Sequence, residues 1–201
     1  MIDMEKILFF AGEFWTLQDT SRDTNNPERY VTDAILTVVN FDIVQKEYYH
    51  KLARDNQFGQ LLGRKLTDDD LPKSADALYY SSNDELFLIE FKLSKRNTKS
   101  REIREKALES LFSLMEITQI DRDYARNNIT FIVAYYEVQK PSRSKIHERV
   151  SSLANKTPIL FDLERYKGLY FKEILTLDHD KFDEYIKKEG WTSMNEKTKI
   201  V

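Results

Sequence analysis

The stretch LFLIEFKL, residues 86–93, decides the fold that we expect of this chain. Its six apolar residues favour a β-strand that is buried in the protein. Side chains of a strand alternate between its two faces, so Glu90 and Lys92 share one face. Ile89, Phe91 and Leu93 share the other face and supply core packing. The stretch therefore predicts a core strand that carries an acid and a lysine side by side.

A second strand-like run, residues 75–80, precedes the first and predicts a β-hairpin. The residues between the two runs, Ser81-Ser82-Asn83-Asp84, have the composition of a tight turn. With the turn centred on Asn83, Asp76 lies directly across from Glu90, and the Cβ atoms of such a pair are ~4.5–5.5 Å apart. The hairpin therefore brings two carboxylates and one lysine together.

The rest of the chain predicts an α/β arrangement, with a sheet covered by helices. Asn26-Pro27 has the composition of a helix start, so we expect a helix from there to Asn40. Helical spacing predicts a further helix at residues 101–120, and the run ITFIVAYY at 129–136 predicts a strand buried on both faces. The remaining expectations are a strand at 41–44, an undecided stretch at 45–62, helices at 142–155 and 179–189, extended or mixed structure at 159–163 and 170–177, and a frayed tail after Trp191.

Composition limits the classes of protein. The 201 residues, 41% hydrophobic and 32% charged, predict one globular domain, and the absence of cysteine excludes disulfide scaffolds, thiolate zinc sites and cysteine nucleophiles. The first residues lack the basic start of a signal peptide, and no apolar run approaches the ~20 residues of a membrane helix, so we expect a cytoplasmic protein with no membrane partner. A net charge of −3 argues against binding nucleic acid by overall charge alone.

Two converging carboxylates form a hard oxygen site that suits Mg²⁺ or Mn²⁺. Such a metal orients a water molecule, lowers its pKa and stabilises negative charge on a phosphate under attack. A neighbouring lysine can hold the water or neutralise the developing charge. Asp76, Glu90 and Lys92 therefore predict the hydrolysis of a phosphodiester. The competing interpretation is a solvated strand face on which the three side chains simply point outward.

The order Asp76, hairpin, Glu90-Phe91-Lys92 resembles the Asp…(Asp/Glu)-x-Lys signature of the PD-(D/E)XK nuclease superfamily. The resemblance implies a restriction-endonuclease-like α/β fold, a central mixed sheet flanked by helices, with its core at about 26–137 and a C-terminal extension at about 138–191. It implies that Asp76 and Glu90 bind the metal and that Lys92 assists the water. Ala75 stands where the signature has Pro.

Members of this superfamily often place a further Glu on their first core helix. Glu28 is the candidate here, as a third metal ligand on the helix expected from Asn26-Pro27. The alternative is that Glu28 only complements the dipole of that helix, whose first turn favours acids.

Basic residues that follow the predicted site could grip a phosphate backbone without reading its sequence. The candidate nucleic-acid-binding residues are Lys95, Arg96, Lys99, Arg101 and Arg104. A second basic stretch, with Lys140, Arg143, Lys145 and Arg149, is equally compatible with a solvated face. Lys106 has a marginal position on its predicted helix for reaching the site.

The sequence thus predicts a metal-dependent endonuclease, and the resemblance favours DNA over RNA as its substrate. Fold-level analogy suggests a role in defence against foreign DNA or in a mobile element. The main rival is a catalytically inactive protein with the nuclease fold, acting as an immunity or inhibitor protein or as a subunit of a complex. A nucleic-acid-binding module without catalysis is a third candidate. Whether the chain forms a homodimer or needs a protein partner stays open.

Overall fold

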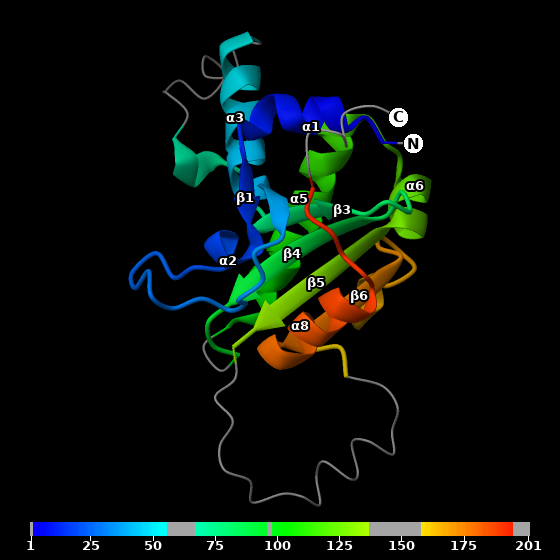
Figure 1. Cartoon of the computed structure of the whole chain (residues 1–201). Coiled ribbons are helices and arrows are strands. Elements are labelled where there is room, and N and C mark those ends of the chain that lie inside the picture. Colours follow the sequence, from blue (N-terminus) through cyan, green and yellow to red (C-terminus); the bar gives the residue numbers. More distant parts are fainter. Residues whose placement is uncertain (1, 56–66, 96–97, 137–157, 195–201) are drawn as a thin grey trace, which may run out of the picture.

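A six-stranded mixed sheet forms the centre of the computed structural model, which describes residues 2–55, 67–95, 98–136 and 158–194 (Figure 1). The strands lie in chain order across the sheet. Neighbouring strands are antiparallel from β1 to β4 and parallel from β4 to β6. Their bounds are β1 Phe14–Thr16, β2 Thr37–Asn40, β3 Ala77–Tyr80, β4 Leu86–Lys92, β5 Ile129–Tyr135 and β6 Glu173–Asp178.

Helices cover both faces of the sheet, so the expected α/β class with a mixed sheet is confirmed. On one face α1 (Met4–Ala11), α3 (Phe41–Asp55) and α5 (Ser100–Thr118) pack against one another. On the other face α8 (His179–Lys188) packs on β5 and β6. The short helices are α2 Leu17–Thr20, α6 Arg122–Asn128, η1 Asp68–Asp70 and η2 Glu164–Tyr166.

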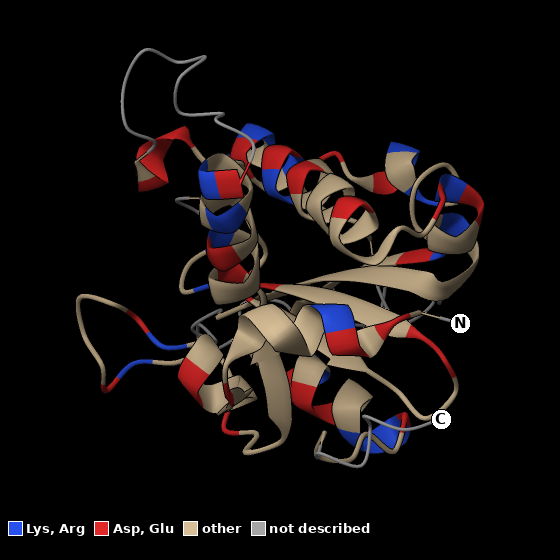
Figure 2. Cartoon of the chain, turned by 90° about the horizontal axis from the view of Figure 1, so that it is seen from above, with Lys and Arg blue, Asp and Glu red and all other residues tan. Residues whose placement is uncertain are grey.

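The core centres on β4 and β5, the two strands that the apolar runs predicted. Every residue of β5 is buried, and in β4 only Lys92 is not fully so. Helix α5 follows β4 in the chain, and helical spacing predicts an apolar stripe on it of Ile103, Ala107, Leu111, Leu114 and Met115. The first four are buried and Met115 is partly buried. On the long helices acids and bases are interspersed, whereas the short helix η1 is entirely acidic (Figure 2).

The predicted helix from Asn26 to Asn40 and the strand after it are wrong, because the order of the two is reversed. Residues 37–40 form β2 and residues 41–55 form α3. The Asn26 side chain accepts a hydrogen bond from the backbone N–H of Glu28, which closes a local turn and starts no helix. Asn40 is the true cap, since its Oδ1 accepts from the backbone N–H of Ile43 at 3.2 Å.

The C-terminal part belongs to the same sheet and core. Strand β6 is confirmed within the stretch expected to be extended or mixed, whereas residues 159–163 form a turn. The frayed tail is wrong as far as residue 194, because Trp191 stacks on Tyr79 with ring centroids 4.1 Å apart and Met194 bonds to Thr37. The helix predicted at 142–155 lies outside the described residues. None of the described helices is long and apolar enough to cross a membrane.

Candidate active site

The hairpin of β3 and β4 sets the first part of the site. Its register pairs Ala77 with Ile89 and Tyr80 with Leu86, which places Asp76 opposite Glu90 as the turn at Asn83 predicted. Asp76 lies just before β3, and its backbone N–H donates to the carbonyl oxygen of Ile89 at 3.0 Å. Its carboxylate accepts from the backbone N–H of Phe91 at 2.6 Å. Both main chain and side chain therefore fix Asp76 against β4.

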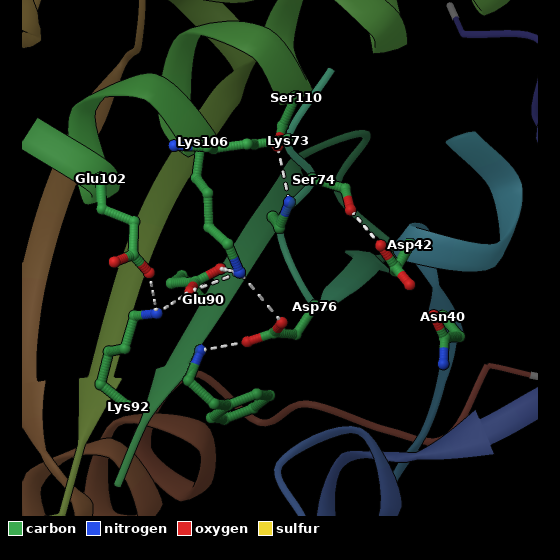
Figure 3. A network of polar contacts seen from close by, with 12 residues as sticks. Asn40, Asp42, Lys73, Ser74, Asp76, Glu90, Lys92, Glu102, Lys106 and Ser110 are labelled. Atoms are coloured by element: carbon green, nitrogen blue, oxygen red, sulfur yellow. Dashed lines mark hydrogen bonds and ion pairs between the residues drawn. The ribbon is translucent and has the colours of Figure 1, made fainter. Parts of the chain in front are cut away.

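Helix α5 supplies the second part through a polar stripe of residues four positions apart. Glu102 accepts a hydrogen bond from Lys92 at 2.8 Å, and Ser110 accepts one from the backbone N–H of Ala75 at 2.6 Å. Between them, Lys106 points down onto the hairpin (Figure 3). Residues at this spacing lie above one another on one side of a helix. One side of α5 therefore touches the site along three successive turns.

Lys106 lies at the point where the two carboxylates converge. Its Nζ is 2.8 and 3.0 Å from the two carboxylate oxygens of Glu90 and 3.5 Å from Oδ1 of Asp76. Lys92 Nζ lies 3.0 Å from Glu90 Oε1 on the other side. Sequence analysis predicted only a marginal position for Lys106. Its spacing of four from Glu102 and from Ser110 is the signal that could have placed it.

Burial dominates the electrostatics of the site. Glu90 is fully buried, and this burial, together with the charge of Asp76, raises the pKa of its carboxyl to about 7 against the pull of both lysines. Burial also raises the pKa of Asp76, opposed by Lys106 and by the N–H of Phe91. For Lys106, burial works against the charged form, but the two carboxylates outweigh it and raise its pKa. The two carboxylates therefore keep Lys106 charged, whereas burial shifts both carboxyls toward the protonated form, and Glu90 titrates near neutral pH.

The loop before Asp76 is tied to both α3 and α5. Gln45 of α3 donates its side-chain amide to the carbonyl oxygen of Pro72 at 2.7 Å, and Ser74 donates its hydroxyl to Asp42. Asp42, in the first turn of α3, also acts on Asp76, whose pKa its negative charge raises further. These hydrogen bonds hold the loop in place and so help to fix the position of Asp76 at the site. Asp42 is an acid that sequence analysis missed, because the start of α3 was predicted to be a strand.

Glu28 does not join the two carboxylates. It is exposed, in a loop rather than on the expected helix, and lines a cavity with Leu93 and Tyr136. Across the described parts of the chain, no group of three or more His, Asp or Glu side chains is arranged to hold a metal ion. The donors that fit a cation are thus the carboxylates of Asp76 and Glu90. Such a pair suits Mg²⁺, which commonly takes one or two protein carboxylates and completes its shell with water and substrate phosphate.

The predicted basic cluster is largely paired with acids. Arg101 Nε contacts Glu105 at 2.6 Å, and Arg104 contacts Asp162 at 2.7 Å. Lys95 lies over the ring of Tyr135, and Lys99 is exposed just before α5. Arg96 and the second basic stretch lie outside the described residues. Each of these two arginines shares its charge with an acid, so this cluster is a weaker phosphate-binding surface than the sequence predicted.

Comparison with protein-family models, with curated protein sequences and with solved structures finds no match for this chain. The functional argument therefore depends on the residues and on the geometry of the site.

Proposed function

We propose that the chain is a divalent-metal-dependent nuclease that hydrolyses phosphodiester bonds, with Asp76 and Glu90 as the metal ligands. The observation that carries the proposal is the convergence of both carboxylates on one cation, the ammonium of Lys106. A point that already attracts one positive charge between two acids also suits Mg²⁺ or Mn²⁺. When bound, the metal would activate water and stabilise negative charge on the phosphate.

Each lysine has a distinct part in this proposal. Lys92, between Glu90 and Glu102, would orient the attacking water or neutralise charge on the phosphate. Lys106 would compete with the metal, because its Nζ fills the point that a cation between the carboxylates would take. A lysine stem is long and flexible, so the ammonium can withdraw and remain close enough to meet the negative phosphate.

The topology around the site supports the proposal. An antiparallel hairpin, β3 and β4, is followed by the crossing helix α5 and the parallel strand β5. This is the order of elements that the resemblance to PD-(D/E)XK nucleases implies, and the restriction-endonuclease-like fold is part of the proposal. DNA as substrate, and a role in defence or in a mobile element, follow from the same analogy.

One observation favours a second candidate, a catalytically inactive protein that keeps the nuclease fold. The ion pairs of Lys92 and Lys106 already neutralise Glu90 and Asp76 without a metal. A chain that has lost catalysis could retain this network as a structural element, and its surface of mixed charge would suit a protein partner (Figure 2). Metal binding separates the two candidates.

The test is cleavage of plasmid DNA, single-stranded DNA and RNA by the whole chain with Mn²⁺ or Mg²⁺. We expect metal-dependent cleavage that EDTA abolishes and that Lys92→Met slows by roughly 100-fold or more, because it removes a charge aimed at the transition state. Lys51→Met is the matched control, since Lys51 lies on α3 and, among the described residues, pairs with Asp55 and with no residue of the site.

Thermal unfolding with and without Mn²⁺ provides the second measurement. The nuclease should gain stability from the metal, and Asp76→Asn should remove that gain. A folded wild type that neither binds the metal nor cleaves any of the three substrates would overturn the nuclease and favour the inactive binding protein.

A further inference from the structure

A cavity of about 250 Å³ lies at the carboxyl ends of β4 and β5, beside the candidate active site. Its walls are Glu28, Arg29 and Tyr30 from the loop before β2, Leu93 from the end of β4 and Tyr136 from the end of β5. The nuclease proposal uses none of these side chains. Their chemistry, two tyrosine rings with one guanidinium and one carboxylate, is that of a binding site for a planar polar group.

The cavity is joined to the active site by the main chain. Tyr136 donates its backbone N–H to the carbonyl oxygen of Lys92 at 2.8 Å, and Leu93 is the residue after Lys92. Side chains alternate along a strand, so Lys92 points toward α5 while Leu93 points to the face that α8 covers. The site and the cavity therefore lie on opposite sides of one strand end. A flexible polymer bound at Lys92 can pass over this end into the cavity.

The aromatic wall is preorganised. The Tyr136 ring packs against His179, the first residue of α8, with centroids 4.6 Å apart and an angle of 32° between the rings. Tyr136 is nevertheless 36% exposed, so part of its ring faces solvent. The neighbouring Asp33 carboxylate raises the pKa of Tyr30, so the Tyr30 hydroxyl stays protonated. A fixed and partly exposed ring offers a stacking surface at little cost in side-chain entropy.

The polar wall of the cavity belongs to a loop whose two ends are bonded to each other. Arg22 and Tyr30 pair as an isolated β-bridge, and the backbone N–H of Asp23 donates to the carbonyl oxygen of Arg29 at 2.8 Å. This loop places Glu28 and Arg29 at the cavity. Their side chains form no ion pair with any residue that the structure describes. An unpaired guanidinium beside aromatic rings can stack on a base or bind a phosphate, and the carboxylate can accept from an exocyclic amino group.

We propose that this cavity holds one unstacked base of the nucleic-acid strand next to the phosphate bound at Lys92. The preferred substrate then has single-stranded character at the cleaved position. This inference rests on the proposed nuclease function and specifies its substrate. A base inside a duplex cannot enter a concave cavity without leaving the stack. The pairing of Arg101 and Arg104 with acids agrees, because a cation that is already paired adds less to the binding of duplex phosphates than an exposed ring adds by stacking.

The experiment measures binding without cleavage, by fluorescence anisotropy in EDTA. The probes are a short labelled single-stranded DNA and the duplex of the same sequence. Wild type should bind the single strand more tightly than the duplex. Tyr136→Ala should weaken single-strand binding roughly tenfold, the loss expected for one stacked base, and Tyr136→Phe should retain it. Tyr170→Ala is the matched control, because Tyr170 precedes β6 at the opposite end of the parallel strands.

Three results would overturn the inference: no single-strand binding by wild type, tighter binding of the duplex, or equal affinity of Tyr136→Ala and wild type. The thermal unfolding of each variant shows that a loss of binding is not a loss of folding. The two proposals fail in different ways. If cleavage depends on metal but Tyr136→Ala leaves binding unchanged, only the proposal of the base site is wrong. If binding depends on Tyr136 but no substrate is cleaved, only the proposal of nuclease activity is wrong.

Discussion

The two faces of β4 are buried almost equally but differ toward the carboxyl end of the strand. Toward α8, Phe91 packs on Phe182 with ring centroids 5.7 Å apart, and Phe87 packs on Trp191 at 4.7 Å. Toward α5, Glu90 is as fully buried as its apolar neighbours but is surrounded by charged side chains. The same strand therefore has apolar packing on both sides, but on the side toward α5 its last residues, Glu90 and Lys92, form an ion-pair network.

The difference shows which face the fold needs. Buried aromatic rings stabilise the folded state by leaving water. Buried ion pairs contribute little, because the loss of hydration offsets most of their mutual attraction. An apolar pair in place of Glu90 and Lys106 would serve the fold at least as well. The charged face is therefore better explained by chemistry than by stability, and three changes test that contrast.

The largest expected effect is on the apolar face. Phe91→Ala should lower the free energy of unfolding by about 3–5 kcal/mol, because it removes a buried ring and leaves a cavity against Phe182. Its backbone N–H, which holds Asp76, is unchanged, so the folded variant should bind Mn²⁺ as wild type does. Denaturant unfolding and calorimetric titration measure the two quantities. A loss below about 1 kcal/mol would contradict the assignment of this face as core.

The second effect concerns the ion pair itself. Lys106→Leu alone leaves Glu90 with Lys92 as its remaining cation and should lower the free energy of unfolding by about 3 kcal/mol. The double change Glu90→Leu with Lys106→Leu removes both charges. It should restore stability to within about 1 kcal/mol of wild type or above it, and should abolish metal binding. Denaturant unfolding checks both variants, and a double variant weaker than the single one would show that the network stabilises the fold.

The smallest effect is the pH dependence of metal binding. The pKa of Glu90 is raised from 4.5 to about 7, so a proton competes with the metal below that value. Affinity for Mn²⁺ should fall roughly tenfold for each pH unit below about 7 and level off above it. For the same reason, Glu90 reduces the stability of the metal-free protein as pH rises from 4.5 through 7, because the folded state holds the proton more tightly.

Calorimetric titration at several pH values tests this dependence, with Glu90→Gln as the control because it cannot titrate. Metal affinity of wild type that is constant across neutral pH would contradict the raised pKa.

Local sequence patterns predicted the structure correctly where the contacts are between residues close together in the chain. The turn at Ser81–Asp84 set the register of the hairpin, and a one-residue slip would have turned Glu90 into the other face. Local patterns gave a wrong helix boundary where two segments carry the same helix-start signal. Asn26 and Asn40 can both cap a helix, and Asn40 does so because Val38 and Val39 before it are buried in β2. The helix expected to carry Glu28 does not form, and Glu28 therefore does not lie at the site.

The sequence by itself determined the core strands, the apolar stripe of α5 and the pairing of Asp76 with Glu90, because strand alternation, helical spacing and turn length act over a few residues. Only the tertiary structure decided how α5 lies on β4. That packing brings Lys106 onto both carboxylates. Other long-range contacts pair Arg104 with Asp162 and bring Arg29 and Tyr136 to one cavity. Contacts between residues far apart in the chain depend on how its helices and strands pack, and no local pattern encodes that packing.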